Sequence, residues 1–151
     1  MIIPELDKPD NVWCPNCDLG KGCRIYETRP QMCRDFKCHY LTDAVLGEEW
    51  NPARAHFVLR TAENILIVQV DPQRPDAWRR QPYHTALRKH AVSVYKKGGK
   101  IIAKIGERAV AILPDRDIDL GLCGDNDRVV ATPQFTPHGV RWNVEKVSPR
   151  T

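Results

Sequence analysis

The chain has 151 residues, of which 42% are hydrophobic and 28% are charged, and its formal net charge is +4. This length supports one modest hydrophobic core, and the composition excludes both two large domains and a largely disordered chain. The positive charge is mild and far from the dense basic face expected of a dedicated nucleic-acid binder, although charge alone decides little.

Neither a membrane span nor a signal peptide is expected. No run of 18 apolar residues occurs, and the opening MIIPELDKPDN has Pro4, Glu5 and Asp7 where a signal peptide needs a basic and then an apolar stretch. The sequence therefore predicts a cytoplasmic protein with no membrane partner.

Residues 1–45 form the first predicted unit, a cysteine-cluster metal-binding module. Five of the six cysteines lie between Asn11 and His39, namely Cys14, Cys17, Cys23, Cys33 and Cys38. In a reducing cytosol such crowding favours metal thiolates over disulfides, and an odd number of thiols cannot pair completely. Residues 11–40 also lack a sustained hydrophobic period, so we expect a metal ion to organise them.

The spacing of the cysteines indicates which of them reach one ion. Two residues separate Cys14 from Cys17, so both thiolates can bind one ion from a single tight turn. Four residues separate Cys33 from Cys38, so a single turn can bring these two thiolates to the same ion. Cys23 is the ambiguous fifth sulfur. Two other interpretations are ordinary reduced thiols and a redox pair at Cys14 and Cys17, but a redox pair is expected near a βαβ unit.

Zinc is the favoured metal, because a structural zinc site needs four ligands and accepts irregular spacings. Iron or a [4Fe-4S] cluster is the alternative, with a redox or enzymatic role. His39 is expected to face solvent or lie beside the site, with ligation as the minority interpretation. Arg29 and Arg34 are candidates to offset the thiolate charge, while Tyr26 and Phe36 are expected to pack beneath the site.

The residues around the later cysteines resemble a known family. Between Cys23 and Cys38 the chain has Ile25, Tyr26, Arg29, Pro30, Cys33, Arg34 and Phe36 in the pattern of the YkgJ-like cysteine-cluster family. The resemblance implies a zinc- or iron-chelating domain and covers about the first third of the chain. Many members open with a longer C-x-x-C-x-x-C-C run, which is replaced here by Cys14-x-x-Cys17, so a second cluster is not implied.

Residues 46–151 form the second predicted unit, an α+β domain with strands at about 56–70, a helix at about 82–97 and strands at about 100–147. The aliphatic run from Asn64 to Val70 predicts a buried strand. Pro82 suits the start of a helix whose apolar residues recur at helical spacing until Gly98 and Gly99 end it.

Two pairs of strands follow the helix. Residues 100–105 and 109–113 predict a hairpin with a short connection at 106–108, and residues 128–132 and 140–147 predict two further strands around a turn at 133–139. The predicted fold class is therefore α+β, with the N-terminal Cys-rich metal-binding module docked on a small antiparallel sheet that one long helix covers.

Weaker patterns remain in the second unit. Residues 114–121 look like the start of a calcium loop, but the glycine is one place late and the closing glutamate is missing, so a strand end or turn is favoured. Cys123 is expected to be a small buried or loop thiol. Nucleic-acid binding is a second alternative, because the helix is surrounded by the basic residues Arg79, Arg80, Arg88, Lys89, Lys96 and Lys97. The aromatic residues among them, Trp78, Tyr83 and Tyr95, are expected to point into the core.

The functional prediction is a zinc-binding protein in which the cysteine cluster has a structural role and supports a surface for an unknown protein partner. No catalytic motif is present, so the sequence favours a non-enzymatic protein. It does not name the partner or the cellular process.

Overall fold

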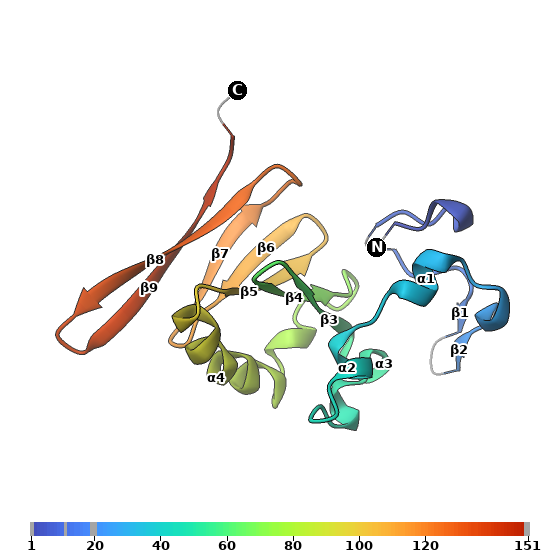
Figure 1. The fold of residues 1–151 in the computed structure, drawn as a ribbon, viewed down its shortest axis with the longest axis horizontal. Coiled ribbons are helices and arrows are strands. Elements are labelled where there is room, and N and C mark those ends of the chain that lie inside the picture. The colour runs from blue at the N-terminus through green and yellow to red at the C-terminus, as the bar shows by residue number, and fades with distance from the viewer. Residues whose placement is uncertain (1, 11, 19–20, 150–151) are drawn as a thin grey trace.

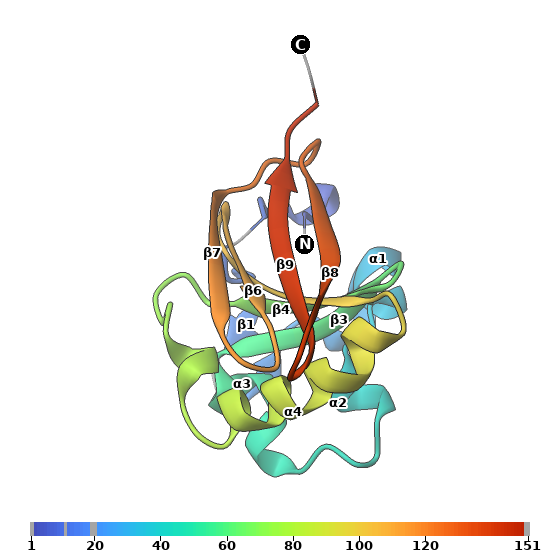
Figure 2. The ribbon, with the colours of Figure 1, turned by 90° about the vertical axis from the view of Figure 1, so that its left-hand side faces the viewer.

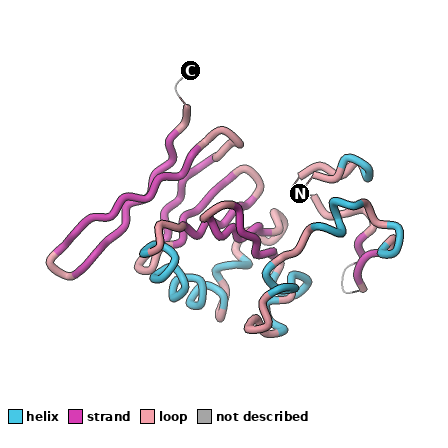
Figure 3. The backbone as a smooth tube through the Cα atoms, in the orientation of Figure 1, coloured by secondary structure: helices cyan, strands magenta, loops and turns pink. Residues whose placement is uncertain are grey.

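The protein is described here from a computed structural model, which places residues 2–10, 12–18 and 21–149. The first third of the chain has only short elements and lies to one side of the strands (Figures 1 and 3). These elements are η1 (Pro4–Leu6), β1 (Cys17–Asp18), β2 (Gly22–Cys23), η2 (Tyr26–Thr28), α1 (Gln31–Asp35), α2 (His39–Thr42), η3 (Glu48–Trp50) and α3 (Pro52–Ala55).

A five-stranded mixed sheet forms the centre of the molecule. Its strands are β3 (Phe57–Ala62), β4 (Ile65–Val70), β5 (Lys100–Ile105), β6 (Arg108–Ile112) and β7 (Asp117–Leu122), and they lie side by side in that order. β4 and β5 are parallel, with Ile65 opposite Lys100, whereas the other neighbouring pairs are antiparallel. The strands at 64–70 and 100–113 are therefore confirmed, but the sheet is mixed.

Helix α4 (Tyr83–Lys96) connects the two parallel strands, as a parallel pair requires. Its buried residues, Tyr83, Leu87, Ala91 and Tyr95, recur every fourth position and so face the sheet together. The helix ends at Lys96, and Gly98 just beyond it has a φ of 79°, which lies in the left-handed region. A Cβ on Gly99 would stand 2.8 Å from the backbone oxygen of Asn64, so glycine is needed for this close approach.

The chain ends in a two-stranded ribbon made of β8 (Arg128–Thr136) and β9 (Gly139–Val147). The two strands pair along their whole length, from Arg128 opposite Val147 to Thr136 opposite Gly139. At its base the ribbon is fixed to the body by Val144, which is 3% exposed, and by Trp142, whose ring lies 5.7 Å from that of Tyr95. Its far end projects beyond the sheet and α4 (Figures 1 and 2).

The core lies between the sheet, α4 and the segment before α4. Its largest fully buried side chains include Trp78, Tyr95, Ile101 and Ile112. Trp78 belongs to η4 (Ala77–Arg79), and Trp50 joins the core through edge-to-face contacts with Phe57 and Tyr83. The prediction that Trp78, Tyr83 and Tyr95 point into the core is confirmed.

The predicted fold class is wrong. Among the described residues the molecule has nine strands and four short helices, so strands dominate it. Its sheet contains a parallel pair, and the 14-residue α4 contacts mainly β5 and β6 instead of covering a small antiparallel sheet. In the described part of residues 1–45 no preformed metal-binding module is present, because no three His, Cys, Asp or Glu side chains stand where they could hold an ion.

No helix within the described ranges is long and apolar enough to cross a membrane.

Candidate metal centre

The turn that contains Cys14 and Cys17 is held by backbone contacts. The Cys17 amide donates to the carbonyl oxygen of Cys14 over 3.0 Å, which closes the turn. Arg24 braces it from outside, because its amide donates to the Asn16 carbonyl over 2.8 Å and its guanidinium donates to the Pro15 carbonyl. The two cysteines thus come from a tight turn, as their spacing predicts.

Cys23 reaches the same place through the small hairpin β1–β2. Cys17 and Cys23 are direct partners across this antiparallel pair, which puts their side chains on one face of the hairpin. Gly22, with a φ of 110°, takes a conformation that few other residues adopt and leads the chain into β2. The sequence left Cys23 ambiguous because this pairing is not visible in the spacing.

Cys33 comes from α1 and is half-buried. Arg34 fixes this helix to the preceding turn, since its Nε donates to the Arg29 carbonyl over 3.1 Å and its Nη2 to the Glu27 carbonyl over 2.8 Å. The Arg34 guanidinium therefore binds backbone oxygens, whereas the sequence suggested that it offsets the charge of the thiolates. Tyr26 also differs from expectation, because its ring is 59% exposed and stacks with the Arg29 guanidinium at 3.6 Å.

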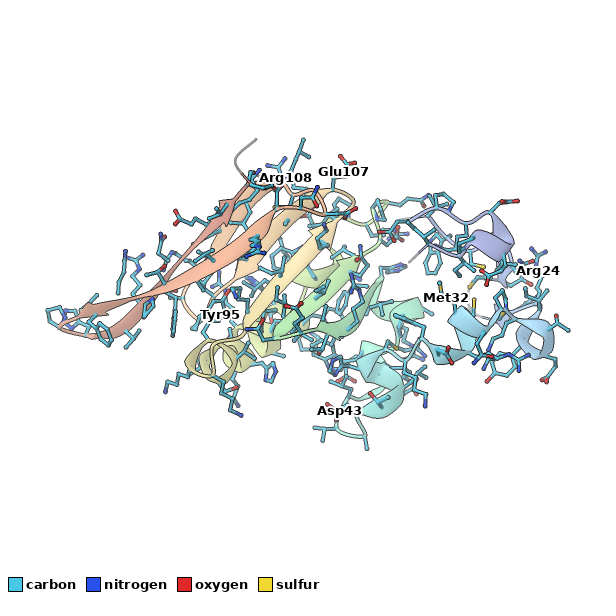
Figure 4. The ribbon with its side chains drawn as sticks, turned by 45° about the horizontal axis from the view of Figure 1, so that its top comes forward. Arg24, Met32, Asp43, Tyr95, Glu107 and Arg108 are labelled. Carbon is cyan, nitrogen blue, oxygen red and sulfur yellow. The ribbon has the colours of Figure 1, made fainter. Side chains whose placement is uncertain are left out.

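Cys14 and Cys23 are close enough to influence the thiols of both Cys17 and Cys33. Burial raises the pKa of the Cys17 thiol, and the neighbouring Cys14, Cys23 and Asp18 raise it further. Burial likewise raises the pKa of Cys33, with additional contributions from Cys14, Cys23 and Glu5. Figure 4 shows sulfur atoms of this segment gathered near Arg24 and Met32.

Glu5 is a neighbour that the sequence did not predict. Its carboxylate is among the groups that raise the pKa of Cys33, so the N-terminal turn η1 lies near α1. The turn is anchored by Ile3, which is 3% exposed and exchanges backbone hydrogen bonds with Lys8. No sequence spacing links Glu5 to Cys33, so only the folded chain reveals this contact.

Cys38 makes its contacts at helix α2 and not with these four thiols. It precedes α2 and is 5% exposed, and its carbonyl accepts a hydrogen bond from the Leu41 amide over 3.0 Å. The next residue, His39, is tied to strand β3 by a 2.7 Å hydrogen bond between its Nε2 and Thr61 Oγ1. Cys38 and His39 therefore belong to the junction between α2 and the sheet.

Cys123 is a buried thiol on the five-stranded sheet, as expected. It is 6% exposed, its amide donates to the Glu107 carbonyl over 2.8 Å, and burial raises its pKa. It takes no part in the N-terminal group of sulfurs.

An apolar cavity of about 400 Å³ lies beside the cysteine turn. On one side it is lined by Val12 and Trp13, the residues just before Cys14, and on the other by Phe57 and Val70 of the central sheet. The two residues that precede the turn therefore face the edge of the central sheet across this cavity.

A second cluster of polar groups surrounds Asp117 on β7. This carboxylate, whose side chain is 10% exposed, lies 3.2 Å from Arg79, 2.9 Å from His84 and 3.2 Å from Arg88. Two arginines that were candidates for phosphate contacts are therefore engaged within the protein. The sequence favours a strand end or turn for the Asp-rich run around it, residues 114–121, and all but the last residue of β7 lies within this run.

Comparisons with protein-family models, curated proteins and solved structures gave no match. The resemblance to the YkgJ-like cysteine-cluster family thus stays a prediction from the residues between Cys23 and Cys38.

Proposed function

We propose that the protein binds one zinc ion through Cys14, Cys17, Cys23 and Cys33, and that this ion stabilises the N-terminal segment as a surface for a protein partner. The observation that supports it is the pairing of Cys17 with Cys23 across β1–β2, next to the turn that contains Cys14. Cys14 and Cys23 are also near enough to Cys33 of helix α1 to raise its pKa. Cys23 here takes the place that the spacing alone gave to Cys38.

The donor set suits zinc. Four thiolates complete a tetrahedral site, which is the usual arrangement of structural zinc. In the metal-free chain the raised pKa of Cys17 and Cys33 means that both thiols are neutral at pH 7. Binding would replace their protons with a cation, whose charge stabilises the thiolates and draws the sulfurs into ligating distance.

A structural role follows from what surrounds the thiols. Residues 12–36 contain no fully buried side chain among those described, so this segment lacks a core of its own. An ion shared by the turn, β1–β2 and α1 would cross-link these elements, as a small hydrophobic core does elsewhere. The residues it would hold in place include the exposed Trp13, Tyr26 and Met32, which suit contact with a partner protein.

The test is the metal content of protein purified under reducing conditions without added metal, followed by titration with zinc against a chromophoric chelator. We expect one zinc per chain and no visible absorbance. The Cys123→Ser variant is the matched control, and it should bind the same amount because that thiol is buried on the sheet. Absence of zinc binding in the reduced protein would refute the proposal.

Iron is the competing outcome of the same experiment. Protein prepared without oxygen would then absorb visible light and release inorganic sulfide in acid, as iron–sulfur proteins do. That result would keep the cysteine ligands but replace structural zinc by a redox-active centre.

A further inference from the structure

The β8–β9 ribbon has one apolar face that continues past the body of the protein. Residues that alternate along paired strands share a face, so Ala131, Pro133 and Phe135 lie on the same side as Val140, Trp142 and Val144. Near the base this face packs on the core through Trp142 and Val144. Further out it is bare, with Phe135 85% exposed and Val140 50% exposed.

The end of α4 adds positive charge beside this bare face. Tyr95 lies near the end of α4 (Figure 4), and its ring contacts that of Trp142. The two residues after Tyr95 are the exposed Lys96 and Lys97. No Asp or Glu occurs between Ala77 and Gly106. We call Phe135, Val140, Lys96 and Lys97 the ribbon–helix step, which combines apolar contact area with a basic rim.

A loop elsewhere on the chain is also apolar, like the ribbon–helix step, but it carries negative charge. Residues 41–49 include Leu41, which is 68% exposed, and Val45, which is 90% exposed. The acids Asp43, Glu48 and Glu49 flank them, and no Lys or Arg occurs between Lys37 and Arg54. We call residues 41–49 the acidic loop, and Figure 4 shows its Asp43 at the outer limit of the molecule.

The acidic loop has a defined shape before any partner arrives. The Val45 amide donates to the Asp43 carboxylate over 3.0 Å, and the Tyr40 hydroxyl donates to the Glu48 carboxylate over 3.0 Å. Helix α2 and Trp50 anchor its two ends to the sheet and the core. A preformed loop loses little conformational entropy when it docks.

We propose that the acidic loop of one copy of this chain docks on the ribbon–helix step of a second copy, so that the protein self-associates. Val45 and Leu41 would cover Phe135 and Val140, while Glu48 and Glu49 approach Lys96 and Lys97. An apolar centre with a charged rim is the usual composition of a protein interface. Because the two surfaces differ, the contact is heterologous and either closes into a ring or extends as a chain.

The charge complementarity is tested by reversing the sign of the charges on one surface at a time. Lys96→Glu/Lys97→Glu and Glu48→Lys/Glu49→Lys should each weaken self-association of the full chain at least about tenfold in Kd, measured by sedimentation with reductant present. Mixing the two variants restores opposite charges at both contacts, so the mixture should associate again. Failure of the mixture to associate would overturn the proposal, as would a wild-type protein that stays monomeric at every concentration in low salt.

The apolar part is tested at Phe135. Phe135→Ser should weaken association to a similar degree, whereas Val147→Ser, on the opposite face of the same ribbon and 45% exposed, should not. Neither change affects a buried side chain, so both variants should retain the melting temperature of the wild type. Equal association by Phe135→Ser and Val147→Ser would overturn the proposal. Binding of a nucleic acid to the lysines without self-association would do the same.

Discussion

Asp117 is the residue on which the junction between α4 and β7 depends. It faces Arg79, His84 and Arg88 within 3.2 Å, and its own side chain is almost completely covered. A carboxylate in this position accepts a hydrogen bond from His84 and forms ion pairs with Arg79 and Arg88, two cations that would otherwise repel one another.

We predict that Asp117→Asn lowers the free energy of unfolding by about 1–3 kcal/mol, less than a fully buried pair would lose because the arginines are partly exposed. Urea denaturation measures this change. Asp119→Asn on the same strand is the matched control, because its ion pair with Arg108 is exposed and should contribute little. Equal losses in the two variants would show that burial of Asp117 is unimportant.

At the residue scale the sequence indicated the group of cysteines but not its membership. Cys14 and Cys17 share a turn that their spacing predicts, and the structure forms this turn. Cys38 was preferred to Cys23 because it closes a familiar spacing. The folded chain instead pairs Cys23 with Cys17 in a local hairpin and covers Cys38, whose neighbour His39 bonds to Thr61 of the sheet.

At the scale of elements, strongly periodic segments were predictable. The aliphatic run of β4, the helical repeat of α4 and the strands β5 and β6 occur close to their predicted places. The strand β7 was missed because its charged residues are characteristic of a turn, and their compensation by Arg79 and Arg88 is visible only in three dimensions. The parallel pairing of β4 with β5 was missed because α4 was interpreted as a cover and not as a connection.

Zinc should order the short elements around the cysteines and leave the central sheet unchanged. We predict that it slows amide exchange in residues 14–18 and 21–33, which have little buried surface, and leaves exchange in β3 to β7 unaltered. Hydrogen exchange read out by mass spectrometry, with zinc and with a chelator, resolves the two regions. Equal protection throughout the chain would mean that the ion stabilises the whole fold.

The whole molecule divides its charge between its two ends. Residues 1–50 contain six basic and nine acidic side chains, a net charge of −3, whereas residues 51–151 contain seventeen basic and ten acidic ones, a net charge of +7. This division is compatible with contacts between copies, because unlike ends attract and like ends repel. It could be read from the sequence, but the surfaces that bring the charges together could not.

The proposed cysteine site would join three neighbouring elements, since its four sulfurs come from a turn, a hairpin and a helix within residues 14–33. If the ion is the main contact between them, removing one ligand should release the metal, while removing a nearby thiol outside the site should not.

The most direct measurement is the zinc content of Cys23→Ser and Cys38→Ser, purified side by side under reducing conditions. Cys23→Ser removes a proposed ligand and should lose most of the bound zinc. Cys38→Ser alters a thiol that the structure places beside the sheet and should retain one zinc per chain. Full zinc in Cys23→Ser together with loss in Cys38→Ser would contradict the proposed site.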